Sequence, residues 1–216
     1  MSAARLYILD LDGTLIDTLT IWSDITRAFL EGFGISVTQE EIDEMDAMSF
    51  SEGSLYLRTH FGVPLSEEEL EDAWLDVASS IFETRTTLMP QALETLYALR
   101  KEGATLVIFS QSPRRLVGGM LQKLGLEQAV DAVILSDETH YPKGSPDALI
   151  EVAREMGFAP ENCVVVEDAP YALEAARKAG MKAVGVLDRN PRANEVPGVA
   201  DLVIEAVSSL LTKRIE

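Results

Sequence analysis

The stretch Asp10-Leu11-Asp12-Gly13-Thr14 directly follows the short apolar run Leu6-Tyr7-Ile8-Leu9, and this junction decides the fold. The apolar run has the length and composition of a buried strand. Residues i and i+2 of an extended chain tend to point to one side, so Asp10 and Asp12 are expected to share a side at the strand end. Gly13 then permits a sharp turn. Because two carboxylates this close repel, one of them should resist ionisation, which favours a cation-binding, nucleophilic or proton-holding role.

Apolar, β-branched runs alternate with amphipathic helical patterns along most of the chain. Strands are predicted at Leu6–Leu9, Thr105–Phe109, Ala132–Leu135, Cys163–Val166 and Lys182–Val186, with a weaker one at Asp201–Ile204. Helices are predicted at Gln91–Lys101, Arg114–Leu124, Pro146–Met156, Tyr171–Ala179 and Ala206–Lys213. Strands that alternate with helices in this way predict an α/β fold with a doubly wound parallel sheet.

The segment from about Thr18 to Thr87 interrupts the alternation, because it contains no convincing strand. Its patterns predict only helices: over Thr20–Gly32, from the capping-box pair Thr38 and Glu41 onward, over Ser51–Phe61 and over Ser66–Phe82. We therefore expect an α/β core made of residues 1–16 and 88–216, with a helical insertion over residues 17–87 and a return linker at Leu88-Met89-Pro90.

The charge balance limits the partners of this chain. Its 216 residues include 18 Lys and Arg against 36 Asp and Glu, for a formal net charge of -18. Such a surface repels nucleic acid and anionic lipid, and it discourages self-association, so we expect a monomer with neither partner. An anionic substrate would need a local cation in its site.

The single cysteine, Cys163, rules out an intrachain disulfide and suits a reducing compartment. Its place in the run Cys163-Val164-Val165-Val166 predicts a buried strand thiol. No apolar run has the length of a secretory signal core or a membrane span, so a cytoplasmic location is expected.

Ligands of open α/β sheets bind beyond the carboxyl ends of the strands, so the residues that follow each predicted strand are candidates for the site. Taken together, several acids, hydroxyls and one lysine would converge on one edge of the sheet, and such a set requires a cation. These residues are Asp10 and Asp12, Ser110-Gln111-Ser112, Ser136-Asp137-Glu138 with Lys143 beyond them, and Glu167-Asp168.

The order Asp10-x-Asp12-Gly13-Thr14, Ser110, Lys143 and Glu167-Asp168 resembles the four motifs of the haloacid dehalogenase superfamily. The resemblance covers essentially the whole chain and is greatest for the phosphoglycolate phosphatase and β-phosphoglucomutase-like subgroup, whose small helical cap corresponds to the insertion. It implies a Mg²⁺-dependent phosphatase, a phosphoric monoester hydrolase, acting on a small phosphorylated metabolite.

By this resemblance Asp10 is the nucleophile that forms an aspartyl-phosphate, and Asp12 is the acid that protonates the leaving oxygen and then activates water. The implied Mg²⁺ ligands are Asp10, the backbone carbonyl of Asp12 and Asp168, with Glu167 close by or acting through water. Ser110 and Gln111 would bind the transferring phosphoryl group, and Lys143 would balance its negative charge. Like-charge crowding is expected to keep Asp12 protonated when needed.

Two motif positions depart from the common family pattern. Gln111 stands where many relatives carry Asn, and Gly144 follows Lys143 where Pro is common. Both are interpreted as changes of loop detail.

The cap favours a phosphatase over the alternative, a β-phosphoglucomutase-like mutase. Mutases of that kind carry a His in the first cap helix, near the position of Trp22, and the cap offers few cations for a second phosphate. The apolar residues Trp22, Met48 and Phe50 are candidates for specificity residues in the cap.

Three further readings are less favoured. A dehalogenase needs no metal and generally lacks the second Asp, which is Asp12 here. A receiver-type signalling domain, which would be non-catalytic, is roughly half as long and has no helical cap in its first crossover. A catalytically dead, phosphate-binding member finds no support because every motif position is filled. His60 and His140 lack partners at metal-ligand spacing and are interpreted as structural or surface residues.

Overall fold

The computed structural model describes residues 5–18, 21–46, 50–135, 138–187 and 194–213. The chain divides into two compact units. The core unit consists of residues 1–19, 87–114 and 121–216, and the helical unit consists of residues 20–86 together with 115–120. Each unit is described separately below.

The core unit is built on a six-stranded parallel sheet with the strand order β5-β4-β1-β6-β7-β8. The strands are β1 (Leu6–Leu9), β4 (Thr105–Ser110), β5 (Ala132–Leu135), β6 (Cys163–Glu167), β7 (Lys182–Val186) and β8 (Leu202–Ile204). The doubly wound α/β fold predicted from the sequence is confirmed.

Strand β1 lies between β4 and β6, where both of its faces are covered. Leu6 pairs with Thr105 on one side and Cys163 on the other, and Leu9 pairs with Ile108 and Val166. All four residues of β1 are buried. A strand buried on both faces needs a continuous apolar run rather than an alternating one, and this is the pattern that precedes Asp10.

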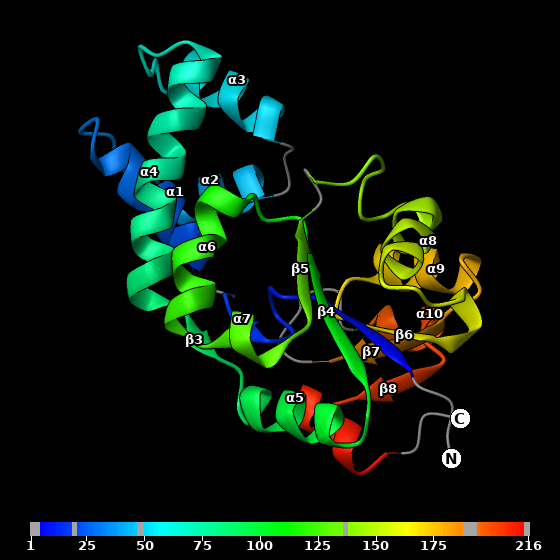
Figure 1. The fold of residues 1–216 in the computed structure, drawn as a ribbon. Coiled ribbons are helices and arrows are strands. Elements are labelled where there is room, and N and C mark those ends of the chain that lie inside the picture. Colours follow the sequence, from blue (N-terminus) through cyan, green and yellow to red (C-terminus); the bar gives the residue numbers. More distant parts are fainter. Residues whose placement is uncertain (1–4, 19–20, 47–49, 136–137, 188–193, 214–216) are drawn as a thin grey trace. The chain divides into compact units, whose positions relative to one another are not determined.

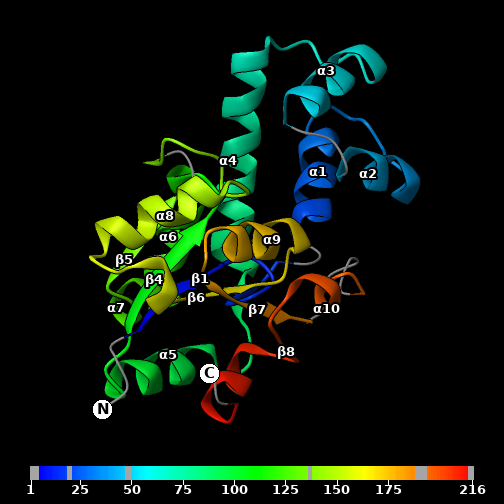
Figure 2. The same ribbon diagram turned by 90° about the vertical axis from the view of Figure 1, so that its right-hand side faces the viewer.

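Helices cover both faces of the sheet (Figures 1 and 2). Leu6 and Ile8 share one buried cluster with α8 and α9, and α5 packs near η3 over the opposite face. The helical elements of the core unit are α5 (Ala92–Lys101), α6 (Arg114–Lys123, of which 115–120 belong to the helical unit), α7 (Leu126–Ala129), α8 (Pro146–Glu155), η2 (Pro160–Asn162), α9 (Pro170–Lys178), α10 (Val196–Val199) and η3 (Val207–Leu211).

Two short elements correct the sequence-based expectations. The segment Ala206–Lys213, predicted as a helix, forms only the 3-10 turn η3. Part of the expected return linker is a strand, because β3 (Thr87–Leu88) pairs antiparallel with β2 (Ile16–Asp17). This pairing joins, within the core unit, the two segments that lead into and out of residues 20–86.

The helical unit contains α1 (Ile21–Glu31), α2 (Gln39–Asp46), α3 (Phe50–His60) and α4 (Glu67–Arg85). Ser66 caps α4: its side chain accepts a hydrogen bond from the Glu69 amide at 3.3 Å, and the Glu69 carboxylate accepts one from the Ser66 amide at 2.9 Å. The apolar residues buried in its centre are Phe29, Leu30, Ile42, Met45, Leu57, Val63 and Leu70. No described helix in either unit combines the length and apolar character that crossing a membrane requires.

Gly185 lies in the middle of β7, where there is no room for a side chain. A Cβ atom at this position would overlap the Val196 side chain and lie 3.0 Å from the Ala200 Cβ. We expect Gly185→Ala to lower the free energy of unfolding by roughly 1–3 kcal/mol, through overpacking. Urea denaturation measures the change.

Gly118→Ala is the matched control, because a Cβ on this α6 glycine would meet nothing within 4 Å. Since alanine is the better helix former, the free energy of unfolding of this variant should be higher by roughly 0.5–1 kcal/mol. Equal effects of the two substitutions would contradict the packing described for β7.

Candidate active site

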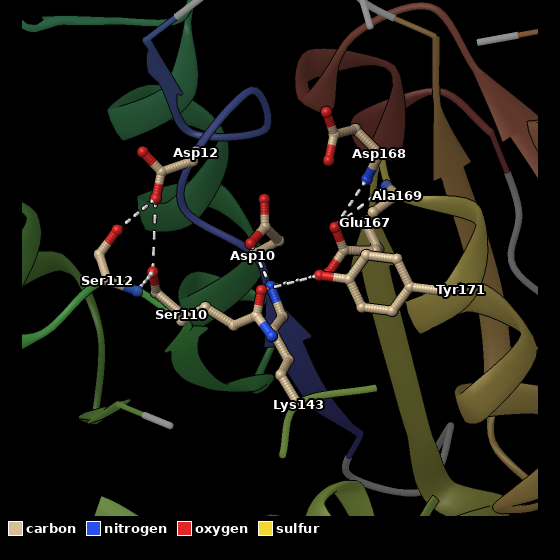
Figure 3. Close-up of polar contacts among 10 residues, drawn as sticks. Asp10, Asp12, Ser110, Ser112, Lys143, Glu167, Asp168, Ala169 and Tyr171 are labelled. Atoms are coloured by element: carbon tan, nitrogen blue, oxygen red, sulfur yellow. Dashed lines mark hydrogen bonds and ion pairs between the residues drawn. The ribbon is translucent and has the colours of Figure 1, made fainter. Parts of the chain in front are cut away.

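The predicted chemical residues of the core unit meet at the carboxyl ends of three adjacent strands (Figure 3). Asp10 follows β1, Ser110 ends β4 and Glu167 ends β6. The structure brings Asp10, Asp12, Ser110, Lys143, Glu167 and Asp168 into one cluster. Parallel pairing of β4, β1 and β6 is the reason, because it places all three strand ends at the same edge.

Lys143 lies between two buried carboxylates. Its ammonium nitrogen donates a hydrogen bond to Asp10 Oδ1 and forms an ion pair with Glu167 Oε2 at 2.8 Å. The three side chains are only 6%, 6% and 2% exposed. Burial alone would lower the pKa of Lys143, but the adjacent carboxylates outweigh burial and raise it above its usual value. Lys143 therefore stays charged and holds Asp10 in a fixed orientation.

One lysine does not neutralise the acids around it. Burial raises the pKa of Asp10 to about 7, and the neighbouring Glu167 carboxylate adds to the increase. Burial likewise raises the pKa of Glu167, despite its contact with Lys143. Without a further cation, the cluster would hold protons instead of being fully ionised.

The geometry of the acids fits a divalent cation. Carboxylate oxygens of Asp10, Glu167 and Asp168 all lie within 4.8 Å of one another. Asp10 Oδ2 is buried and has no hydrogen-bond partner in the described part of the chain. At Gly13, whose φ is +80°, a Cβ atom would lie 2.6 Å from Asp168 Oδ2, so a glycine is required there. An all-oxygen set of this kind suits a hard ion such as Mg²⁺.

Glu167 is also tied to the chain that follows it. Its Oε1 accepts hydrogen bonds from the amides of Asp168 and Ala169, each at 3.1 Å. With Oε2 paired to Lys143, both carboxylate oxygens are engaged. Glu167 thus fixes the turn that carries Asp168 as well as the position of Lys143.

Asp12 is held by hydroxyl groups rather than by a cation. Its Oδ2 accepts hydrogen bonds from Ser112 Oγ at 2.9 Å and from Ser110 Oγ at 3.4 Å. Ser110 Oγ is oriented in turn by the Ser112 amide, which donates to it at 3.0 Å. Ser112 is among the residues that the sequence analysis expected at this edge of the sheet, but no specific role was predicted for it.

The pKa of Asp12 is raised, as expected, but the predicted cause is wrong. Burial is the largest contribution, and hydrogen bonds from Ser112 and other hydroxyls oppose it. The repulsion between the two carboxylates acts instead on Asp10, whose pKa it helps to raise. Desolvation therefore favours the protonated form of Asp12.

Gln111 contacts a residue that sequence reasoning missed. The hydroxyl of Tyr171, in the first turn of α9, donates a hydrogen bond to Gln111 Oε1 at 2.9 Å. No motif signalled Tyr171, because its contact with Gln111 joins a loop and a helix that are 60 residues apart in sequence.

The residues proposed for cap specificity lie in the helical unit or outside the described chain. Trp22 is partly exposed and stacks on Trp74, with ring centroids 5.9 Å apart. Met48 is outside the described residues, and Phe50 begins α3 with a side chain that is not described. The two histidines have carboxylate neighbours: His60 lies 3.7 Å from Glu41, and His140 Nδ1 hydrogen-bonds Glu151.

Residues 7–186 match the family model of the haloacid dehalogenase-like hydrolases. The chain belongs to this family. A fructose-1-phosphate phosphatase from Escherichia coli is 30% identical over 187 residues, which cover 83% of this chain and 94% of that protein. A phosphoglycolate phosphatase from Pseudomonas putida is 25% identical over 190 residues, covering 84% and 69% of the two chains. These relatives confirm the expected enzyme class, phosphoric monoester hydrolase.

Solved structures of this hydrolase family share the fold. A candidate β-phosphoglucomutase from Thermotoga maritima superposes with a TM-score of 0.84 at 23% identity, covering 96% of this chain and 97% of that one. CbbY from Rhodobacter sphaeroides, solved with phosphate, superposes with a TM-score of 0.81 at 21% identity, covering 96% of both chains. At these identities the likeness concerns the fold alone.

Asp10 should make the stability of the metal-free protein depend on pH. Its carboxyl titrates at 3.8 in an unfolded chain and at about 7 when folded. Between these values the folded state binds more protons, so the free energy of unfolding falls as the pH rises. The asparagine of the Asp10→Asn variant cannot ionise. The free energy of unfolding of this variant should therefore fall less between pH 5 and pH 8 than that of the unaltered protein.

Urea denaturation in chelator measures this difference. Parallel pH dependences for the two proteins would show that Asp10 is not held in a desolvated site.

Proposed function

We propose that this hydrolase is a Mg²⁺-dependent phosphatase that cleaves small phosphorylated metabolites through an aspartyl-phosphate on Asp10. The observation that carries the proposal is the buried cluster in which Lys143 orients Asp10 beside Glu167 and Asp168. A second acid, Asp12, whose pKa is raised by burial, belongs to the same cluster. A nucleophile, a proton donor and a cation site are the parts that phosphoryl transfer requires.

In the first step an oxygen of the Asp10 carboxylate attacks phosphorus, and the bond from phosphorus to the leaving oxygen breaks. Asp12 gives its proton to that oxygen, so the product leaves as an alcohol. Lys143 stabilises the charge on the phosphoryl oxygens, and the Ser110 hydroxyl donates a hydrogen bond to one of them. Gln111 is proposed to bind the phosphoryl group together with Ser110.

In the second step Asp12, now ionised, takes a proton from a water molecule that attacks phosphorus. The acyl-phosphate bond breaks, Asp10 is regenerated as a carboxylate and inorganic phosphate is released. The hydroxyls of Ser112 and Ser110 keep Asp12 in place between its two roles.

We assign the Mg²⁺ ligands to Asp10, Asp168 and the backbone carbonyl of Asp12, with Glu167 bound directly or through water. When bound, the ion neutralises charge on the phosphoryl group and on the acids. The buried, unpartnered Asp10 Oδ2 and the raised pKa values of the acids support this assignment.

Sugar phosphates and phosphoglycolate are the proposed substrate class, because the named relatives act on such compounds. We further propose that residues 17–87 form a cap whose side chains, including Trp22, Met48 and Phe50, contribute to specificity. The protein is proposed to act as a monomer in the cytoplasm, with neither nucleic acid nor membrane as a partner, in keeping with its net charge of -18.

Phosphate release from a panel of phosphomonoesters tests the proposal. The panel contains 2-phosphoglycolate, fructose 1-phosphate, a hexitol phosphate and p-nitrophenyl phosphate, each assayed with Mg²⁺ and with chelator. We expect Mg²⁺-dependent release that falls by on the order of 10⁴-fold or more in Asp10→Asn, because the nucleophile is lost. Asp147→Asn makes the same chemical change at an exposed residue of α8 and should retain activity.

Activity that survives in Asp10→Asn would overturn the assignment of the nucleophile. Absence of phosphate release, combined with isomerisation of β-glucose 1-phosphate, would instead favour the mutase. The partly buried Trp22, stacked on Trp74, offers no proton shuttle of the histidine kind, so we expect no isomerisation.

A further inference from the structure

The two positions that depart from the family's motifs, Gln111 and Gly144, both contact Tyr171. Gln111 Oε1 accepts a hydrogen bond from the Tyr171 hydroxyl at 2.9 Å. A Cβ atom at Gly144 would lie 2.9 Å from Cδ2 and 3.3 Å from Cε2 of the Tyr171 ring. Each departure therefore accommodates the same side chain. We call the cluster of Gln111, Gly144 and Tyr171 the Tyr171 bridge.

Gly144 is required by the position of the ring rather than by its own backbone. Any residue with a Cβ, including proline, would be closer to the ring than side chains normally approach. Because Gly144 directly follows Lys143, the ring packs on the loop that supplies the buried ammonium group. Tyr171 thus lies against the loop that carries Lys143.

The Tyr171 hydroxyl is near the reacting groups. In Figure 3 the ring lies beside Glu167, and the hydroxyl is directed toward the side where Lys143 and Asp10 lie. The charges of Lys143, Glu167, Asp10 and Asp168 all act on the phenol, while burial raises its pKa to about 12. The residue is nevertheless 43% exposed, so a bound molecule has access to it.

The hydrogen bonding of Tyr171 determines which groups it can recognise. Its single proton is donated to Gln111, but a phenol oxygen also has lone pairs that accept hydrogen bonds. Resting on the proposed phosphatase function, we propose that Tyr171, fixed by Gln111 and Gly144, accepts a hydrogen bond from a hydroxyl group on the substrate's leaving group. The core itself would then select phosphorylated sugars and polyols, in addition to any selection by the cap.

Tyr171→Phe tests the proposal, because it removes only the hydroxyl oxygen. For the best sugar or polyol phosphate of the panel, we expect KM to rise about three- to tenfold, the effect of one lost hydrogen bond, with kcat nearly unchanged. For p-nitrophenyl phosphate, whose leaving group carries no alcohol hydroxyl, KM should be the same in the variant and the unaltered protein. Tyr97→Phe, at a half-exposed tyrosine of α5, is the matched control and should leave KM unchanged for both kinds of substrate.

Gly144→Ala tests the bridge from its other side. The added Cβ should displace the ring and raise KM for the same hydroxylated substrates. In a Tyr171→Ala background there is no ring to displace, so Gly144→Ala should then have little further effect. Additive effects in the double variant would show that Gly144 acts independently of Tyr171.

The outcomes separate this inference from the function on which it rests. An equal loss on both kinds of substrate, no loss on either, or hydrolysis of p-nitrophenyl phosphate without any hydroxylated compound would overturn the role of Tyr171 and leave the phosphatase intact. If the unaltered protein hydrolysed no phosphomonoester, p-nitrophenyl phosphate included, both the role of Tyr171 and the proposed phosphatase function would be overturned.

Discussion

The site depends on one buried contact, the Lys143 ammonium between the carboxylates of Asp10 and Glu167. A buried carboxylate without a partner is strongly unfavourable, and a lysine with the same burial would lose its proton. Together the groups remain buried and fixed, and they join three segments that are far apart in sequence. The remaining excess of negative charge, on Asp10, Glu167 and Asp168, is the physical reason for a metal at this edge.

The parallel sheet makes this contact possible. Because β1 pairs with β4 and β6, the chain after each strand emerges at the same edge, and the loop before α8 brings Lys143 to it. Asp10 and Asp12 are consecutive acids of one motif, yet they are placed in different surroundings. Asp10 contacts Lys143, and Asp12 contacts the hydroxyls of Ser110 and Ser112. The separation of the proposed nucleophile from the proposed proton donor follows from these surroundings rather than from sequence.

Much of the core was predictable because its signals are local. Apolar runs marked β1, β4, β5, β6 and β7, and the motif acids stand at the ends of β1 and β6. The strands β2 and β3 were missed because two residues carry no periodicity. The cause of the raised pKa of Asp12 could not be predicted, since burial is a property of the folded chain. The contacts of Tyr171 with Gln111 and Gly144 were hidden for a similar reason, because they join residues distant in sequence.

The central claim is that Asp10 receives the phosphoryl group, and trapping the intermediate tests it most directly. The protein would be mixed with acetyl phosphate and Mg²⁺, quenched in acid within a single turnover, and digested for mass spectrometry. If Asp10 is the nucleophile, one added phosphoryl group will be found on the peptide that contains it, and none will be found in Asp10→Asn. A phosphoryl group on another residue, or turnover by the Asp10→Asn variant, would contradict the mechanism proposed for this site.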